Sequence, residues 1–158
     1  MTLRLSARQI ALLAEMGVVW APLLAPRRRS LRWVALTADA PTESEGRLLR
    51  NILRAVEACF PADTRHAALS EAYRGGPPLD WLRNRFDPEG ERNLGVLLFG
   101  GEASTLLLGS PGVAGQVLHL EHCSVAVART LAEITTLADA KPRLWRAVCE
   151  VSERLLAA

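Results

Sequence analysis

The chain lacks the features that would place it in a membrane or hold it together with disulfides. No apolar run approaches the roughly 20 residues that cross a bilayer, and its start carries no apolar stretch ending in a small-residue cleavage site. The three cysteines, Cys59, Cys123 and Cys149, are scattered and include no CxxC pair, which indicates reduced and mostly buried thiols. We therefore expect a cytoplasmic protein without a membrane partner.

The patterns of common catalytic and metal sites are also missing. No GxGxxG or GxxxxGK loop is present to bind a nucleotide, and no GxSxG turn is present to hold a nucleophilic serine. The cluster of metal-capable residues at 119–123 places His119 and Glu121 on one face of a strand and His122 on the other, so they do not close one tetrahedral site. We expect no metal, no cofactor and no catalytic residues.

The net charge of +2 is too small for a nucleic-acid-binding protein, so we expect no direct sequence-specific contact with nucleic acid. The charge is distributed unevenly, however, because six arginines near the start stand against one acid, Glu15. These arginines are Arg4, Arg8, Arg27, Arg28, Arg29 and Arg32. This segment either faces an acidic protein surface or phosphates, DNA included, or is a solvated linker.

Residues 6–17 have the pattern of a short amphipathic helix. Ser6 and Gln9 have capping-box spacing at its start, and Gly17 suits the left-handed residue that ends a helix. One face carries Leu5, Leu12, Leu13 and Met16, with Ile10 at its margin, and the other carries Arg4, Arg8 and Glu15. So short a helix is not stable alone in water, and it must therefore lie on its own domain or on a partner.

The residues that follow this helix favour a partner. The apolar stretch 18–20 is succeeded by Pro22 and Pro26, which prevent the helix from continuing. Tryptophan is enriched among binding hot spots, so Trp20 is the residue that we most expect at an interface. The alternative is that the whole arm, Trp20 included, packs back on its own domain.

We expect residues 1–30 to form this arm and a tether, and residues 31–158 to form a single domain. The expected elements are a buried strand at 31–38, a helix at 42–60, strands at 94–100, 105–109 and 116–122, a helix with Val127, Leu131, Ile134 and Ala138 on one face, and a last helix with Pro142 near its start. Turn residues make 71–93 a surface excursion, within which Leu79, Trp81, Leu82 and Phe86 fit one or two helical turns. Trp33 and Trp145 have the spacing of core residues. This order predicts an α/β fold: a three-layer α/β/α sandwich with a small, mostly parallel central sheet, preceded by the short N-terminal amphipathic arm.

Three segments in this order resemble the psi subunit family of bacterial DNA polymerase III. They are Arg8-Gln9 … Leu12 … Met16-Gly17-Val18 … Trp20, then Trp33–Asp39 with the helix to Phe60, and then Leu131-Ala132-Glu133 … Leu137–Trp145. Together they cover about half of the chain. The sequence departs from the family at 71–93, which is longer, and at Cys123-Ser124-Val125, where the family usually has Ser-Pro.

The resemblance implies a non-catalytic accessory subunit of the polymerase holoenzyme in DNA replication. Such a subunit connects the gamma/tau subunits of the clamp loader to the chi subunit, which contacts single-stranded-DNA-binding protein. The clamp-loader contacts carried over from the family would be Arg8, Leu12, Met16, Gly17, Val18 and Trp20. The surface that binds chi cannot be placed from the sequence.

Two other functions remain open at this point. Asp39 and the segment His122-Cys123-Ser124 each follow an expected strand, as the acid and the His-Pro-Ser loop do in base-excising glycosylases, which gives a uracil-DNA-glycosylase-like or nucleotide-processing enzyme as the alternative. Asp39 is followed by Ala40-Pro41, however, and His122 by cysteine, so both patterns are incomplete. A homo-oligomeric binding domain also fits, because the mean hydropathy of +0.11 is slightly apolar.

Overall fold

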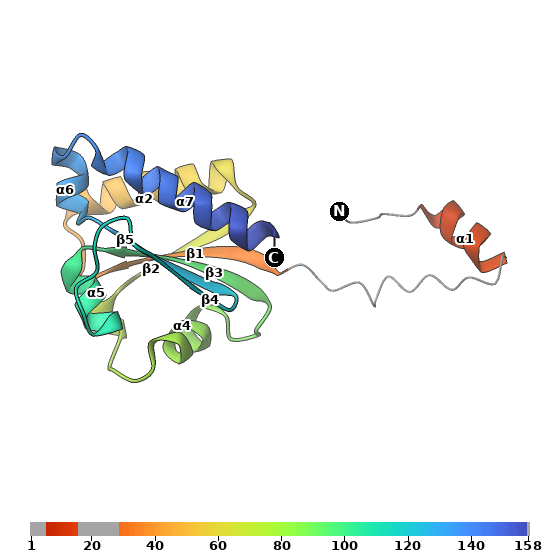
Figure 1. The fold of residues 1–158 in the computed structure, drawn as a ribbon, viewed down its shortest axis with the longest axis horizontal. Coiled ribbons are helices and arrows are strands. Elements are labelled where there is room, and N and C mark those ends of the chain that lie inside the picture. The colour runs from red at the N-terminus through yellow and green to blue at the C-terminus, as the bar shows by residue number, and fades with distance from the viewer. Residues whose placement is uncertain (1–5, 16–28, 158) are drawn as a thin grey trace.

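The structure is a computed structural model that describes residues 6–15 and 29–157 (Figure 1). Its elements are α1 (Ala7–Glu15), β1 (Ser30–Thr37), α2 (Glu43–Cys59), β2 (Ala62–Ala68), α3 (Leu69–Ala72), α4 (Pro78–Phe86), β3 (Arg92–Phe99), α5 (Gly101–Leu108), β4 (Val117–Leu120), β5 (Cys123–Ala128), α6 (Leu131–Thr136) and α7 (Ala140–Ala157). The five strands form one sheet in the order β2-β1-β3-β5-β4. All neighbouring strands are parallel except β4, which runs antiparallel to β5 at one edge.

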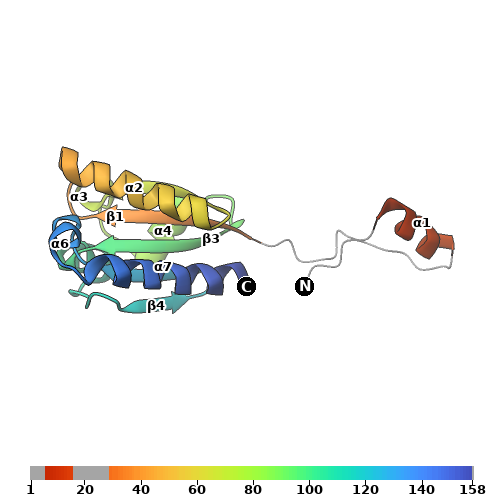
Figure 2. The same ribbon diagram turned by 90° about the horizontal axis from the view of Figure 1, so that it is seen from above.

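Helices cover both faces of the sheet, which confirms the predicted three-layer α/β/α sandwich. Figure 1 shows α2, α6 and α7 on one side of the sheet and α4 and α5 on the other, and Figure 2 shows α2 and α7 side by side along it. The central strand β3 is buried at seven of its eight positions. Its apolar run therefore faces helices on both sides, as expected for a parallel strand in the middle of a covered sheet.

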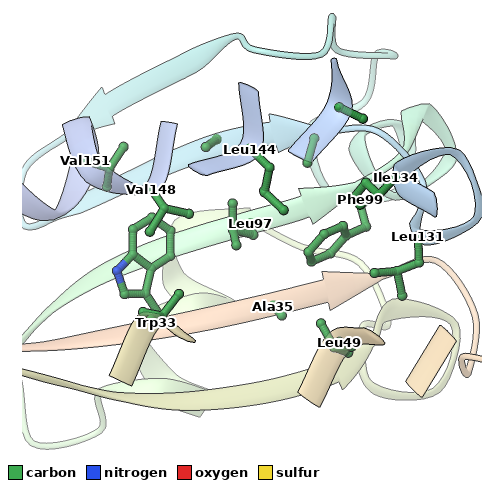
Figure 3. Close-up of a cluster of buried hydrophobic side chains, with 14 of the residues drawn as sticks. Trp33, Ala35, Leu49, Leu97, Phe99, Leu131, Ile134, Leu144, Val148 and Val151 are labelled. Atoms are coloured by element: carbon green, nitrogen blue, oxygen red, sulfur yellow. The ribbon is translucent and has the colours of Figure 1, made fainter. Parts of the chain in front are cut away.

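The core beneath α2, α6 and α7 is built around Trp33, which is fully buried (Figure 3). The indole Nε1 of Trp33 donates a hydrogen bond of 2.9 Å to the hydroxyl of Ser152 on α7. This bond satisfies the one polar atom of the indole in an apolar surrounding, where an unpaired donor would cost free energy. Trp33 thus joins β1 to the last helix over a long sequence distance, as its spacing predicted for a core residue.

The core on the other face contains a helix from the segment expected to be a surface excursion. Within residues 71–93, α4 places Leu82 and Phe86 against strands β1, β3 and β5, and both side chains are buried. Trp81 packs on Phe86 with ring centroids 5.8 Å apart. The expected helical turns are present as α4, but the expectation of a surface excursion was wrong because Leu82 and Phe86 belong to the core.

Two further assignments from the sequence are wrong. Residues 105–109 lie in helix α5 and its cap rather than in a strand: Gly100 turns the chain with φ 96°, and Gly109 ends the helix in the left-handed region with φ 81°. Val127 lies in strand β5, on the opposite face of the sheet from Leu131 and Ile134. The sequence also gave no indication of β2, an edge strand with charged side chains.

The predicted capping box at the start of α1 is confirmed, and Thr42 caps the start of α2 in a similar way. At α1, the backbone N–H of Gln9 donates to the Ser6 hydroxyl and the N–H of Ser6 donates to the Gln9 side chain. At α2, the N–H of Glu45 donates to the Thr42 hydroxyl, which in turn donates to the Glu45 carboxylate. These bonds satisfy two backbone N–H groups at the start of α1 and one at the start of α2, where the first helical turn leaves N–H groups without partners.

Among residues 6–15 and 29–157, no helix combines the length and the apolar character that crossing a bilayer requires.

Candidate protein interaction sites

Helix α1 presents an apolar side chain to solvent. Leu12 is 52% exposed, and the other α1 side chains that the structure describes, Ala7, Arg8, Gln9, Ala11 and Glu15, are exposed as well. A nine-residue helix gains little stability from its own backbone hydrogen bonds in water. An exposed leucine on such a helix is therefore available to a second surface.

The remaining residues assigned to clamp-loader contact lie outside the described part of the chain. The structure places Arg8 and Leu12 on α1, seven and three residues before its end at Glu15. Met16, Gly17, Val18 and Trp20 belong to residues 16–28, which the structure does not describe. Their predicted roles stay predictions.

A second site is an apolar groove between α2 and α7, which has a volume of about 270 Å³. The lining is almost entirely apolar and consists of Leu48, Asn51, Ile52 and Ala55 from α2, Ile134 from α6, and Lys141, Leu144 and Trp145 from α7. Ile134 and Leu144 are buried, whereas Leu48, Ile52 and Trp145 are only partly buried. The groove thus leaves apolar surface in contact with water that a partner would cover.

Trp145 is not enclosed in the core, contrary to its sequence spacing. Its ring lies 6.3 Å from that of Phe60, centroid to centroid, and it remains partly exposed where it lines the groove. The reason is that α2 and α7 stand over different strands: α2 lies over β2, whereas α7 lies mainly over β5 and β3. Trp145 lies in the space between α2 and α7 and is therefore covered only in part.

A third feature is a cluster of charges at the amino end of β1, where the chain enters the domain. Asp63 on β2 accepts two hydrogen bonds of 2.9 Å from the Arg32 guanidinium and one of 3.0 Å from Arg92. The Arg32 hydrogen bonds hold the pKa of the Asp63 carboxyl below its usual value, and the same bonds raise the pKa of Arg32. Arg32 also donates to the carbonyl of Phe86, at 2.6 Å.

This cluster joins β1, β2, β3 and α4, and its charges are largely neutralised within the domain. Asp87 is buried, accepts hydrogen bonds from the N–H groups of Glu91 and Arg92, and lies 4.0 Å from Arg29. An open pocket of about 730 Å³ beside it is lined by both arginines and glutamates. A lining of both signs gives no strong preference for an anion, so we assign the cluster a structural role in fixing the start of the domain.

The side chains required for the glycosylase-like alternative lie at opposite ends of the parallel strands. Asp39 follows the carboxyl end of β1, whereas His122 precedes the amino end of β5, and both strands run parallel to β3. Since a strand rises about 3.3 Å per residue, roughly 20 Å of sheet separate the two positions. The expectation that they share one crevice is wrong, and the geometry supports no catalysis by this pair.

The histidines near β4 make local hydrogen bonds. His119 on β4 lies 3.0 Å from the Ser124 hydroxyl, and His122, which has φ 58° in the turn, lies 3.1 Å from the Asn93 side-chain oxygen. In the part of the chain that the structure describes, no three or more histidine, cysteine or acidic side chains gather to hold a metal ion.

The cysteines differ in burial. Cys123 is buried, Cys59 is exposed and Cys149 is partly buried, so the expectation of mostly buried thiols is wrong.

The groove is the site that sequence reasoning missed. The apolar residues of α2 that line the groove share one broad apolar face of this helix with core residues such as Leu49 and Val56. The spacing of the apolar residues in α2 therefore predicted a single buried face. No local pattern distinguishes the residues that line the groove from those in the core.

Scans against protein-family models, against curated proteins and against solved structures found no match to this chain.

Proposed function

We propose that this protein is a non-catalytic adaptor of the psi type in bacterial DNA replication. Its arm binds gamma/tau subunits of the clamp loader, and its α/β domain binds a second protein, the chi subunit, which contacts single-stranded-DNA-binding protein. The resemblance in the arm, the first strand and helix, and the C-terminal segment supports this assignment. In this proposal the protein acts in the cytoplasm and takes no cofactor.

One observation carries the proposal: Leu12 is exposed on an amphipathic helix that precedes the domain. Burying a leucine side chain contributes about 1.5–3 kcal/mol, which α1 does not gain from its described surroundings. When a helix becomes ordered only on its partner, the cost of ordering it reduces the net free energy of binding. The arm therefore gives the protein a contact for the clamp loader besides the surfaces of the domain.

The test compares two substitutions one residue apart in the intact chain. Leu12→Asp places a carboxylate on the apolar face of α1, whereas Ala11→Asp places the same residue on the face of Arg8 and Glu15. Calorimetric titration into purified clamp loader should show at least a tenfold loss of affinity for Leu12→Asp and a small change for Ala11→Asp. Equal affinities for the two variants would contradict the proposed role of the arm.

A further inference from the structure

We propose that the groove between α2 and α7 binds an amphipathic helix of a second protein, with acidic residues along the flanks of that helix. The inference rests on the proposed adaptor function, which requires a docking surface on the domain besides the arm. It assigns that surface to residues for which the sequence resemblance gave no role.

The shape of the groove suits a helix. Figure 2 shows α2 and α7 running side by side along the sheet, and these helices have 17 and 18 residues. Buried Ile134 and Leu144 form the floor, and the partly exposed Leu48, Ile52 and Trp145 line its sides. Helices pack 8–10 Å apart with apolar side chains of one between those of the other, so leucines at intervals of three and four residues would fill this space.

The charged residue in the lining of the groove, Lys141, is positive. Arg54 lies directly before Ala55 and one turn after Asn51 on α2. Neither Lys141 nor Arg54 takes part in an ion pair among the residues that the structure describes, whereas Arg47 pairs with Glu43 at 3.3 Å. No acidic residue lines the groove. A partner helix with glutamates or aspartates beside its apolar face is complementary to this rim.

The same charges disfavour the two occupants that this chain itself could supply. The polar face of α1 carries Arg8 as well as Glu15, so these two side chains offer no net negative charge to Lys141 or Arg54. A second copy docked groove to groove would face Lys141 and Arg54 with their own equivalents. Like charges brought together at an interface oppose binding, which leaves an acidic helix of another protein as the fitting partner.

The experiment uses the full chain and two synthetic helical peptides of equal length. Both peptides carry leucines at i, i+3, i+4 and i+7, and they differ only in having glutamates or lysines at the flanking positions. Amide chemical shifts of the isotope-labelled protein report both the affinity and the location of binding. We expect the glutamate peptide to bind at least tenfold more tightly and to shift resonances of α2 and α7.

Reversing the charges of Lys141 and Arg54 should reverse the preference of the groove between the two peptides. The double variant Lys141→Glu with Arg54→Glu should bind the lysine peptide more tightly than the glutamate peptide. The matched control Arg74→Glu reverses an exposed cation after α3, outside the groove lining, and should leave the preference unchanged. Equal affinity for both peptides, no binding of either at millimolar concentration, or shifts confined to other elements would overturn the inference.

Two more readouts separate this inference from its competitors. Contacts between α1 and α2 or α7 in the free protein would overturn it in favour of the arm, and a dimer dispersed by the charge reversal would overturn it in favour of a second copy. Clamp-loader affinity of the charge-reversed variant should equal that of the unchanged chain. If the unchanged chain binds the clamp loader but shows no peptide preference, the groove assignment alone is refuted. If the unchanged chain shows the peptide preference but does not bind the clamp loader, the adaptor function alone is refuted.

Discussion

Gly95 lies directly opposite Trp33 on the neighbouring strand, and a Cβ atom at position 95 would be 2.9 Å from the indole ring. Trp33 is fully buried and is fixed by its hydrogen bond to Ser152, so the ring has little freedom to move away. The absence of a side chain at position 95 is thus what allows a tryptophan to lie flat across the centre of the sheet.

Gly95→Ala should therefore destabilise the protein. The added methyl group overpacks the core beneath α7, which typically costs about 1–3 kcal/mol. Denaturant unfolding should show a lower midpoint with an unchanged slope. Gly46→Ala is the matched control, because a Cβ there meets only Arg50 at an ordinary 3.7 Å and position 46 lies within α2. That change should leave stability equal or raise it by up to about 1 kcal/mol. A destabilisation as large as that of Gly95→Ala would show that the indole contact is not the cause.

The carboxylate of Asp63 should stabilise the fold in a pH-dependent way. Its hydrogen bonds from Arg32 hold its pKa below the usual value, so it stays ionised in the folded protein where the unfolded chain takes up a proton. That contribution is complete above the ordinary carboxyl pKa of about 4 and is lost as the pH falls through the lowered folded pKa.

We expect Asp63→Asn to lower the free energy of unfolding by roughly 1–3 kcal/mol at pH 7, because a hydrogen bond to a charged group is lost. The difference from the unchanged protein should shrink below about pH 4. Glu153→Gln removes an exposed carboxylate that has no ion pair among the described residues and should change stability by less than about 0.5 kcal/mol. A pH-independent effect of Asp63→Asn would refute the ionic explanation.

The three thiols should react in a defined order. Burial raises the pKa of the Cys123 thiol to about 11, and its side chain has no exposed surface. At pH 8 only about one such thiol in a thousand is ionised, and the thiolate is the reactive form. Cys59 is exposed at the end of α2, whereas partial burial raises the pKa of Cys149. Iodoacetamide followed by peptide mass spectrometry should find Cys59 alkylated first and Cys123 last. In guanidinium the three rates should converge, and equally fast labelling of Cys123 in the folded protein would contradict its position in β5.

A helix or strand of this fold could be predicted from the sequence only where its own residues form a recognisable local pattern. Strand β3 and helices α2 and α7 were predictable because continuous apolar runs or periods near 3.6 fix them locally. Strand β2 was not, since its pairing with β1 and the Asp63–Arg32 hydrogen bonds hold a polar segment in the sheet. The segment 105–109 was ambiguous, because a short apolar run fits a helix as well as a strand and its Gly100 turn decides between them.

The candidate sites divide in the same way. The start of α1 was predictable because Ser6 and Gln9 satisfy each other's backbone groups within a few residues. The groove was not predictable, since whether Trp145 is enclosed depends on where α2 and α7 stand over the sheet, which no local pattern specifies. The expectation that Asp39 and His122 lie close together failed for the same reason. His122 precedes a strand that runs parallel to β3, and this direction is set by the topology of the sheet rather than by the local sequence.

The central claim is that the arm, rather than the domain, binds the clamp loader. Surface plasmon resonance with immobilised clamp loader tests it by comparing the full chain with a chain that lacks residues 1–26. We predict that the shortened protein keeps its cooperative unfolding transition and shows no measurable binding. If it binds as tightly as the full chain, the adaptor account of this protein is contradicted.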